Sequence, residues 1–368
     1  MPFYNDLRPK SDSDKRDYAL VFPKMTVTEK KRTINGLLRL KTGLAKLPNK
    51  KCDENLLIAS WNIKEFGHTK QRLPEAYFYI AEIVSAFDLV AVQEIKSTLV
   101  DLEILVRILG SSWDYVINDV TNGRDGNQER SAYLFNRERV RLSGLAGEIT
   151  LWDDLTADSE VKQLKRAPYI TGFKAGWKSF AMVNLHLHPG DSDDDVAYRA
   201  EEVRLLIEVF KEKTKRKHLW TQNIVLVGDF NFYDEDADTI GNIEASGFHQ
   251  IGSLAGLDTN ASKTESYDRF FLTENDYFCI EKEAGGAESA GVVNPFDFVY
   301  RDGGHAPYTK TMQAQYGGNK TEAEFLATID KYYKQPWRKN QVSDHFPIWF
   351  ELCIDSSGEF LESKLAAF

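Results

Sequence analysis

The sequence predicts an α/β fold, because short apolar segments typical of buried strands alternate with longer segments of helical periodicity. The expected strands occupy residues 56–61, 88–92, 131–135, 180–183, 224–227, 270–272 and 347–352. Helices are expected over residues 75–86, 99–109, 196–213 and 235–246. The chain has 368 residues, of which 42% are hydrophobic, and this is enough for one large core.

The number and spacing of the cysteines and the length of the apolar runs indicate the cellular compartment in which the protein is expected. Cys52, Cys279 and Cys353 are odd in number and scattered, so they form neither a disulfide framework nor a metal cluster. This usage fits a reducing environment, and a cytoplasmic location is expected. The polar N-terminus lacks the apolar segment of a secretory signal, and no apolar run approaches the length of a membrane span. No membrane association is expected.

Polar clusters stand at the ends of five apolar segments. Asp344 and His345 directly precede the segment that begins at Pro347. The other clusters are Trp61-Asn62, Gln93-Glu94, Asn184-Leu185-His186 and Gly228-Asp229-Phe230-Asn231. One such ending is readily explained as a strand-to-turn cap. Five of them, with three carboxylates, four amides and two histidines, indicate convergence on one centre that binds metal and phosphate.

The residue types suit hydrolysis of a phosphodiester, which needs a cation, a base that activates water and an acid that protonates the leaving oxygen. Histidine fits the acid and base roles because its unperturbed pKa lies near neutrality. Mg²⁺ prefers oxygen ligands, whereas Zn²⁺ fits poorly because no Cys or His cluster has ligand spacing. The oxygen ligands available to Mg²⁺ are those of Glu94, Asp344, Asn62 and Asp229.

Each imidazole also needs a carboxylate that orients it. Glu129 precedes the strand at 131–135, and Asp268 precedes the strand at 270–272. Either residue alone is equally well explained as a member of a surface ion pair.

These motifs resemble the endonuclease/exonuclease/phosphatase superfamily and, within it, the DNase I-like nucleases. The similarity extends from about Leu56 to Leu352 and keeps the order of the family's motifs. The matching segments are 61–67 with Thr69 and Lys70, then 93–96, 123–124 with 129–130, 166–168, 185–186, 228–231, 267–269 and 343–347. The resemblance implies a two-sheet α/β sandwich with flanking helices.

The resemblance also implies roles for single residues. It implies that His186 and His345 are the acid and base, oriented by Glu129 and Asp268. It implies Glu94 as the main metal ligand, with Asn62 and Asp344 nearby, and Mg²⁺ as the cofactor, with Mn²⁺ as an alternative and Ca²⁺ as a structural ion. Asp229 and Asn231 are expected to position a second cation, the water or the phosphoryl oxygens. The expected contacts to substrate come from Arg166, Arg124, Lys96 and Tyr267, and Lys96 matches a basic residue that enters the minor groove.

Other activities of the same superfamily share some of these motifs. Abasic-site endonucleases share the Asp-Phe-Asn and Asp-His motifs but carry a tyrosine near the position of His186. Sphingomyelinases and phosphoinositide phosphatases carry a histidine there. Glu129-Arg130 and Tyr267-Asp268-Arg269 favour the nuclease. The resemblance then implies cleavage of DNA that leaves 5′-phosphates. One alternative function is that of a nuclease effector whose activity is controlled by a protein partner. A catalytically silent binding module is a less favoured alternative, because the acid, base and metal positions are intact.

Three local features depart from the family pattern or lie beside it. Asn127 stands where a tyrosine stacks on a deoxyribose in DNase I-like enzymes, which puts minor-groove docking in doubt. His188 repeats on the face of His186 and is interpreted as an anchor of the loop, with an extra contact to substrate or metal as the alternative. The acidic run 191–195 lacks an EF-hand pattern and is interpreted as a solvated helix N-terminus.

The family core is expected at 53–355, with an extension before it, an insertion within it and a tail after it at 356–368. Residues 1–52 form an expected extension, in which residues 1–51 hold 13 Lys and Arg against 5 Asp and Glu, while the whole chain has a net charge of −10. Leucines at helical spacing from Thr28 to Lys46 predict a helix that is docked on the core through Leu37, Leu38 and Leu44, bound to a protein partner, or used as a basic DNA-binding arm. The region 303–341 is an expected insertion with a helix at 321–333. Its aromatic and basic residues are expected either to bind bases and phosphates or to pack on each other.

Overall fold

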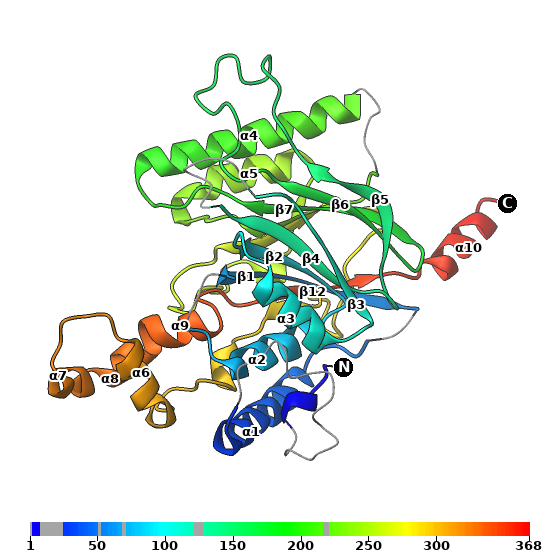
Figure 1. Ribbon diagram of the computed structural model, residues 1–368. Helices are drawn as coiled ribbons and strands as arrows, with labels where there is room; N and C mark the ends of the chain where they lie inside the picture. The colour runs from blue at the N-terminus through cyan, green and yellow to red at the C-terminus, as the bar shows by residue number, and fades with distance from the viewer. Residues whose placement is uncertain (1, 8–24, 51–52, 68–70, 121–127, 216–220) are drawn as a thin grey trace.

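The computed structural model describes residues 2–7, 25–50, 53–67, 71–120, 128–215 and 221–368. Two six-stranded sheets make up its centre, in the orders β11-β12-β1-β2-β4-β3 and β5-β6-β7-β8-β10-β9 (Figure 1). The strands of the first sheet are β1 (Asn55–Phe66), β2 (Leu89–Ile95), β3 (Trp113–Ile117), β4 (Arg130–Asn136), β11 (Ala290–Val292) and β12 (Ile348–Cys353). Those of the second are β5 (Arg141–Glu148), β6 (Tyr169–Ala175), β7 (Lys178–His186), β8 (Ile224–Asp229), β9 (His249–Gln250) and β10 (Asp268–Leu272). The predicted two-sheet α/β sandwich is confirmed.

Each sheet has one parallel pair at its centre, β1 with β2 and β7 with β8, and the other strand pairs are antiparallel. Both faces of these strands are buried, because helices cover one face of each sheet and the opposite sheet covers the other. Alternate side chains of a strand point to opposite faces, so they enter different parts of the core. In β1, Leu56 and Ile58 pack between the sheets, whereas Leu57 and Ala59 pack beneath the helices. This double coverage explains why the strands appear in the sequence as unbroken apolar runs.

Helices cover the outer faces of the sandwich (Figure 1). The first sheet carries α2 (Pro74–Ser85) and α3 (Val100–Leu109), with α1 (Val27–Leu44) packed on α2, and the second carries α4 (Asp193–Lys215) and α5 (Ala237–Ala245). The helices predicted at 75–86, 99–109 and 196–213 are confirmed to within a few residues, and the one at 235–246 begins with a 3₁₀ turn at Asp234–Asp236. The acidic run lies at the beginning of α4, as interpreted from the sequence.

The N-terminal helix α1 is docked on the core. Thr26 and Glu29 form a reciprocal capping box at its beginning, a motif that satisfies two backbone N–H groups. Leu37 and Leu40 are buried in the core cluster that includes α2, and Lys41 forms an ion pair with Glu82 of α2. The prediction that Leu38 packs on the core is wrong: it is 59% exposed, because its position on the helix faces away from α2.

The region 303–341 contains α6 (Thr309–Gln315), α7 (Glu322–Ala327), α8 (Ile329–Tyr332) and α9 (Arg338–Gln341), with a π-helical turn at Tyr333–Trp337. Thr321 caps α7 as expected, but the single helix predicted at 321–333 is wrong because α7 ends at Ala327. Tyr308, Tyr333 and Trp337 are buried and stack on one another. Base stacking by these three residues is therefore excluded, and the alternative of mutual packing is confirmed for them.

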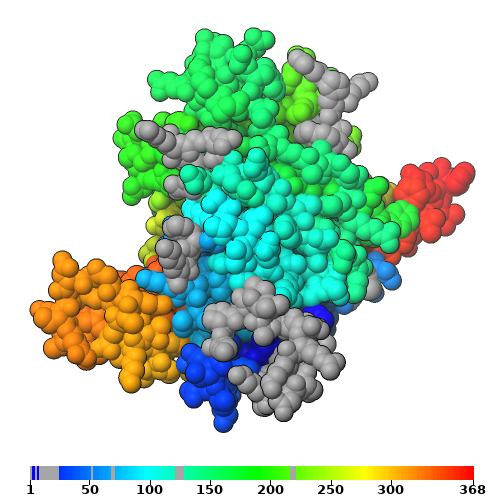
Figure 2. Space-filling view, in the orientation of Figure 1, coloured from blue at the N-terminus to red at the C-terminus, as the bar shows by residue number. Residues whose placement is uncertain are grey.

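Two parts project from the body of the molecule. Figure 2 shows one lobe formed by α6–α8 and another formed by α10 (Ser357–Leu365). Phe360 of α10 contacts Trp177 and Tyr277. Within the described ranges, no helix combines the length and apolar character that a membrane crossing requires. The expected boundaries at 52, 355 and 356 stay a prediction.

The docking of α1 predicts a contrast between two of its leucines. Leu40→Ala removes a fully buried side chain, so the free energy of unfolding should fall by about 2–5 kcal/mol. Leu38→Ala changes an exposed side chain on the same helix and should cost less than about 0.5 kcal/mol. Urea unfolding followed by circular dichroism measures both variants. Equal losses in the two would contradict the docked orientation.

Candidate active site

The candidate site lies where the carboxyl ends of the two parallel strand pairs meet. In the first sheet Asn62 is in register with Gln93, and in the second His186 is in register with Asp229. A buried hydrogen bond of 2.7 Å from Gln93 Nε2 to Asn184 Oδ1 joins β2 to β7 across the sandwich. The two pairs of strands are thereby held with their polar ends together.

Asn184 completes this connection with its amide nitrogen. Asn184 Nδ2 donates to the carbonyl oxygens of Val92 and Ala132 in the opposite sheet, at 3.2 Å each. The polar cluster at 184–186 thus has two functions. Asn184 joins the sheets, and only His186 faces the site.

The carboxylate of Asp229 stands at the middle of the site. Its Oδ2 lies 3.6 Å from His186 Nε2, 3.7 Å from His345 Nε2 and 3.0 Å from Asn62 Nδ2, which donates to it. Asp229 is 2% exposed, so these contacts occur away from bulk water. Both imidazoles therefore present the same ring nitrogen to one point.

Gly228 permits this arrangement. Its φ of 132° is a conformation that residues with a Cβ rarely adopt, and an added Cβ would lie 2.0 Å from the carbonyl oxygen of Leu185. Asn231 fixes the chain beyond Asp229, since its N–H donates to Asp229 Oδ1 and its Nδ2 donates to the carbonyl of Leu187. The motif Gly228–Asn231 thus sets the direction of the Asp229 carboxylate beside His186.

Glu129 holds the second nitrogen of His186. Glu129 Oε2 lies 3.1 Å from His186 Nδ1 and 2.9 Å from Arg166 Nε, and Oε1 lies 3.0 Å from Lys96 Nζ. Burial alone would raise the pKa of the Glu129 carboxyl, but the hydrogen bond to His186 and the charges of His186, Arg166 and Lys96 hold it well below its usual range. The predicted pairing of Glu129 with His186 is present.

Asp268 holds the other imidazole in the same way. Asp268 Oδ2 lies 2.8 Å from His345 Nδ1, and Asp268 is in register with Asp229 on the neighbouring strand. Burial disfavours a charged imidazole, but the charges of Asp268 and Asp229 together raise the pKa of His345 well above its usual value. The predicted pairing of Asp268 with His345 is also present, and the ring of Tyr267 lies against His345.

The expected metal ligands gather beside Asp229. Glu94 has a φ of 62°, and its carboxylate accepts hydrogen bonds from Asn62 Nδ2 and the N–H of Glu65, at 3.0 Å each. Asn62 Oδ1 is buried and has no hydrogen-bond partner among the described residues. Asp344 Oδ2 lies 2.6 Å from the ammonium of Lys64, a cation held among these oxygens. An all-oxygen donor set with one unpartnered acceptor fits a hard divalent cation.

Lys64 is a site residue that the sequence reasoning missed. Burial and the charges of Asp344, Glu94 and Glu65 act on it in opposite directions, and the carboxylates prevail and raise its pKa. A signal was present: Lys64 lies two residues after Asn62, and residues so spaced on a strand share a face. Its charge partly neutralises the carboxylates that are expected to hold the metal.

Two of the predicted substrate-binding residues, Arg166 and Lys96, lie beside Glu129 in the site. Arg166 and Lys96 both contact Glu129, and their side chains are only 10% and 13% exposed. Their role toward phosphate stays a prediction, and the structure adds a role in fixing Glu129. Arg124, like Asn127, lies outside the described residues.

His188 does not join the site. Its Nε2 lies 2.7 Å from Asp195 Oδ1 at the beginning of α4, and its ring packs on Tyr198. Its N–H donates to the buried Glu202. The interpretation of His188 as an anchor of the loop is confirmed.

The fold and these motifs define a class of protein. A model of the Endonuclease/Exonuclease/phosphatase family matches residues 59–345, most of the chain, and the chain belongs to this family. Among known relatives, it is 29% identical to bovine deoxyribonuclease-1 over 280 residues, which cover 72% of this chain and 89% of that protein. Human deoxyribonuclease gamma is 28% identical over 185 residues, 47% of this chain and 55% of the relative. Canine deoxyribonuclease-1 is matched over 60% of its length.

Solved structures of similar fold include D. rerio TDP2 complexed with single strand DNA product. That chain is 14% identical and superimposes with a TM-score of 0.48, over 81% of this chain and 98% of its own length.

The surroundings of Glu129 predict a dependence of stability on pH. Its folded-state pKa is depressed, so its ionised form stabilises the protein above the unfolded-state pKa of about 4.3, and this stability is lost as pH falls through the folded-state pKa. Glu129→Gln leaves Arg166 and Lys96 without their buried partner and should lower the free energy of unfolding by about 3–5 kcal/mol at pH 7. The free energies of unfolding of variant and wild type are measured with urea from pH 7 to pH 3. The difference between them should become smaller below pH 4. A difference that is constant over this range would contradict the assignment.

Proposed function

We propose that the protein is a divalent-metal-dependent endonuclease that hydrolyses DNA by a two-histidine acid–base mechanism and leaves 5′-phosphates. The observation that carries the proposal is the approach of His186 Nε2 and His345 Nε2 to the same Asp229 oxygen, at 3.6 and 3.7 Å. Each imidazole also has its own carboxylate at Nδ1. Family membership and the similarity to deoxyribonucleases support a phosphodiester as the bond that is cleaved.

The two histidines have complementary roles in the proposed reaction. One imidazole accepts a proton at Nε2 from the attacking water, and the other donates a proton from Nε2 to the leaving 3′ oxygen. The raised pKa of His345 favours it as the donor, which leaves His186 as the acceptor. Glu129 and Asp268 keep Nε2 of each ring directed at the substrate, because they occupy the opposite nitrogen.

The remaining polar residues position the phosphodiester. Mg²⁺ or Mn²⁺, held by Glu94, Asp344 and the free oxygen of Asn62, would neutralise charge on the phosphoryl oxygens. Asn231 keeps Asp229 in place, and the ring of Tyr267 limits the movement of His345. Arg166, Lys96 and Arg124 are proposed to contact the phosphates of the substrate strand.

Substrate class and metal dependence are tested together. The protein is incubated with supercoiled DNA, linear DNA, RNA and sphingomyelin, each with Mg²⁺, with Mn²⁺ or with EDTA. Nicking of supercoiled DNA that requires the metal is expected, with 5′-phosphate ends detected by end labelling. Full activity in EDTA, or cleavage of sphingomyelin without cleavage of any nucleic acid, would overturn the proposal.

The histidine roles predict a graded loss of turnover. His186→Ala and His345→Ala should each lower kcat by about 10² or more, since each removes a general acid or base. Glu129→Gln and Asp268→Asn should cause smaller losses, because the imidazoles remain but lose their orienting partners. Single-turnover DNA cleavage gives the rates, and circular dichroism shows whether each variant is folded.

His188→Ala is the matched control for the alanine variants. It removes an imidazole two residues from His186 that contacts Asp195 rather than Asp229. Its rate should stay close to that of the wild type. Near-normal turnover in either His186→Ala or His345→Ala would show that the acid–base pair is misassigned.

A further inference from the structure

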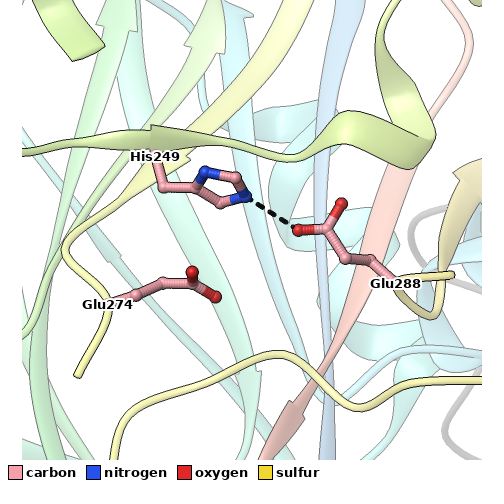
Figure 3. A group of neighbouring side chains, drawn as sticks. All are labelled: His249, Glu274 and Glu288. Carbon is pink, nitrogen blue, oxygen red and sulfur yellow. Dashed lines mark hydrogen bonds and ion pairs between the residues drawn. The ribbon is translucent and has the colours of Figure 1, made fainter. Parts of the chain in front are cut away.

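A second group of ligating side chains lies far from the candidate active site. His249, Glu274 and Glu288 converge near one end of β10, as Figure 3 shows. His249 is in register with Leu272 at that end of the strand, whereas the active-site residue Asp268 occupies the other end. Four residues of strand separate the two ends by about 13 Å. The group is therefore distinct from the site that contains Asp229.

The three side chains are close enough to share one ion. One potential ligand atom from each residue lies within 4.8 Å of the others. His249 Nε2 lies 2.9 Å from Glu288 Oε1. In Figure 3 the carboxylate of Glu274 points toward this pair but has no hydrogen bond to either residue. Two carboxylates are thus brought together beside a single imidazole.

The surroundings of Glu288 hold it in a fixed orientation. Its Oε2 accepts a hydrogen bond of 3.2 Å from the N–H of Ser253, so Oε1 is left for His249. The Glu288 side chain is 16% exposed, whereas that of His249 is 47% exposed and open to solvent. An ion can therefore arrive from water at a ligand set in which one carboxylate is already oriented.

We propose that His249, Glu274 and Glu288 form a binding site for a divalent transition-metal ion, with Zn²⁺ as the best fit. An imidazole nitrogen combined with two carboxylate oxygens suits Zn²⁺ and similar ions, whereas Mg²⁺ and Ca²⁺ prefer oxygen ligands alone. Three protein ligands leave one position of a tetrahedral ion for water. The metal would displace the proton of the hydrogen bond between His249 Nε2 and Glu288 Oε1.

The position of the ligands gives such an ion a structural role. His249 and Glu274 belong to the edge of the second sheet, at β9 and just beyond β10, whereas Glu288 lies two residues before β11 of the first sheet. One ion bound to all three would link the two sheets at the end of the sandwich away from the active site. An ion that binds the folded state but not the unfolded state raises the melting temperature of the protein.

Binding is measured directly on the full chain. Purified protein freed of metal is titrated with Zn²⁺ in the presence of millimolar Mg²⁺, and bound zinc and the melting temperature are recorded. His249→Ala and Glu274→Gln should each lose one bound zinc per chain and most of the zinc-dependent rise in melting temperature. Co²⁺ provides an independent readout, since the visible absorption of a bound Co²⁺ ion should weaken in both variants.

Two controls separate this site from the active site. Glu283→Gln removes one carboxylate from the same exposed segment without touching the cluster, so zinc binding should be unchanged. DNA cleavage with Mg²⁺ should be unaffected in His249→Ala and Glu274→Gln, because neither residue contacts the catalytic centre. Equal zinc stoichiometry and equal melting shifts in wild type, His249→Ala and Glu274→Gln would overturn the proposal and leave only a surface ion pair.

Discussion

The geometry of the site depends on the alignment of two parallel strand pairs from different sheets. Carboxyl ends of parallel neighbours meet at one edge of a sheet, and the β1–β2 and β7–β8 pairs bring two such edges face to face. The buried hydrogen bond between Gln93 and Asn184 fixes the relative position of the sheets. A shift of one residue in any of these strands would turn its polar end residue to the opposite face. The register therefore determines both the core and the site.

Burial of so many charged groups at this junction requires each to have a partner. Glu129 is matched by Arg166 and Lys96, and Asp344 by Lys64. Asp229 has no cationic partner of this kind among the described residues, and it contacts the two imidazoles, the amide of Asn62 and the N–H of Asn231. Because an isolated buried carboxylate is costly, Asp229 favours a nearby cation, and its charge, after that of Asp268, helps to raise the pKa of His345. The same groups that stabilise Asp229 are those proposed to transfer protons.

Much of this site could be predicted because its residues follow buried strands directly. An apolar run that ends in His186 or Asp229 places the polar group at a strand end, and a strand end has a fixed position once the sheet is formed. The pairing of Glu129 with His186, and of Asp268 with His345, came from the family resemblance. Neither pair could come from spacing, because their members lie 57 and 77 residues apart.

The errors share a physical origin. Whether Leu38 or Leu40 faces α2 depends on the rotation of α1, which helical spacing alone does not fix. The aromatic residues of 303–341 carry polar atoms, so their composition fits both a binding surface and a small core, and only the buried stack of Tyr308, Tyr333 and Trp337 decides between them. Lys64 was overlooked because a lysine beside a glutamate in sequence resembles a solvated pair. Its partner is Asp344, which lies 280 residues away.

Charge within the site constrains what can bind there. The described part of the site contains five carboxylates, those of Glu94, Glu129, Asp229, Asp268 and Asp344, against three cationic side chains, those of Lys64, Lys96 and Arg166. Each of the three cations is already in contact with a carboxylate, so the positive charge that each offers to an incoming phosphate is largely offset. A phosphodiester adds a further negative charge, and the two imidazoles can offset only part of the excess. A divalent cation beside Glu94 and Asp344 would supply the missing charge at the proposed position of the phosphoryl group. The excess of carboxylates therefore supports the proposed metal dependence independently of the family resemblance.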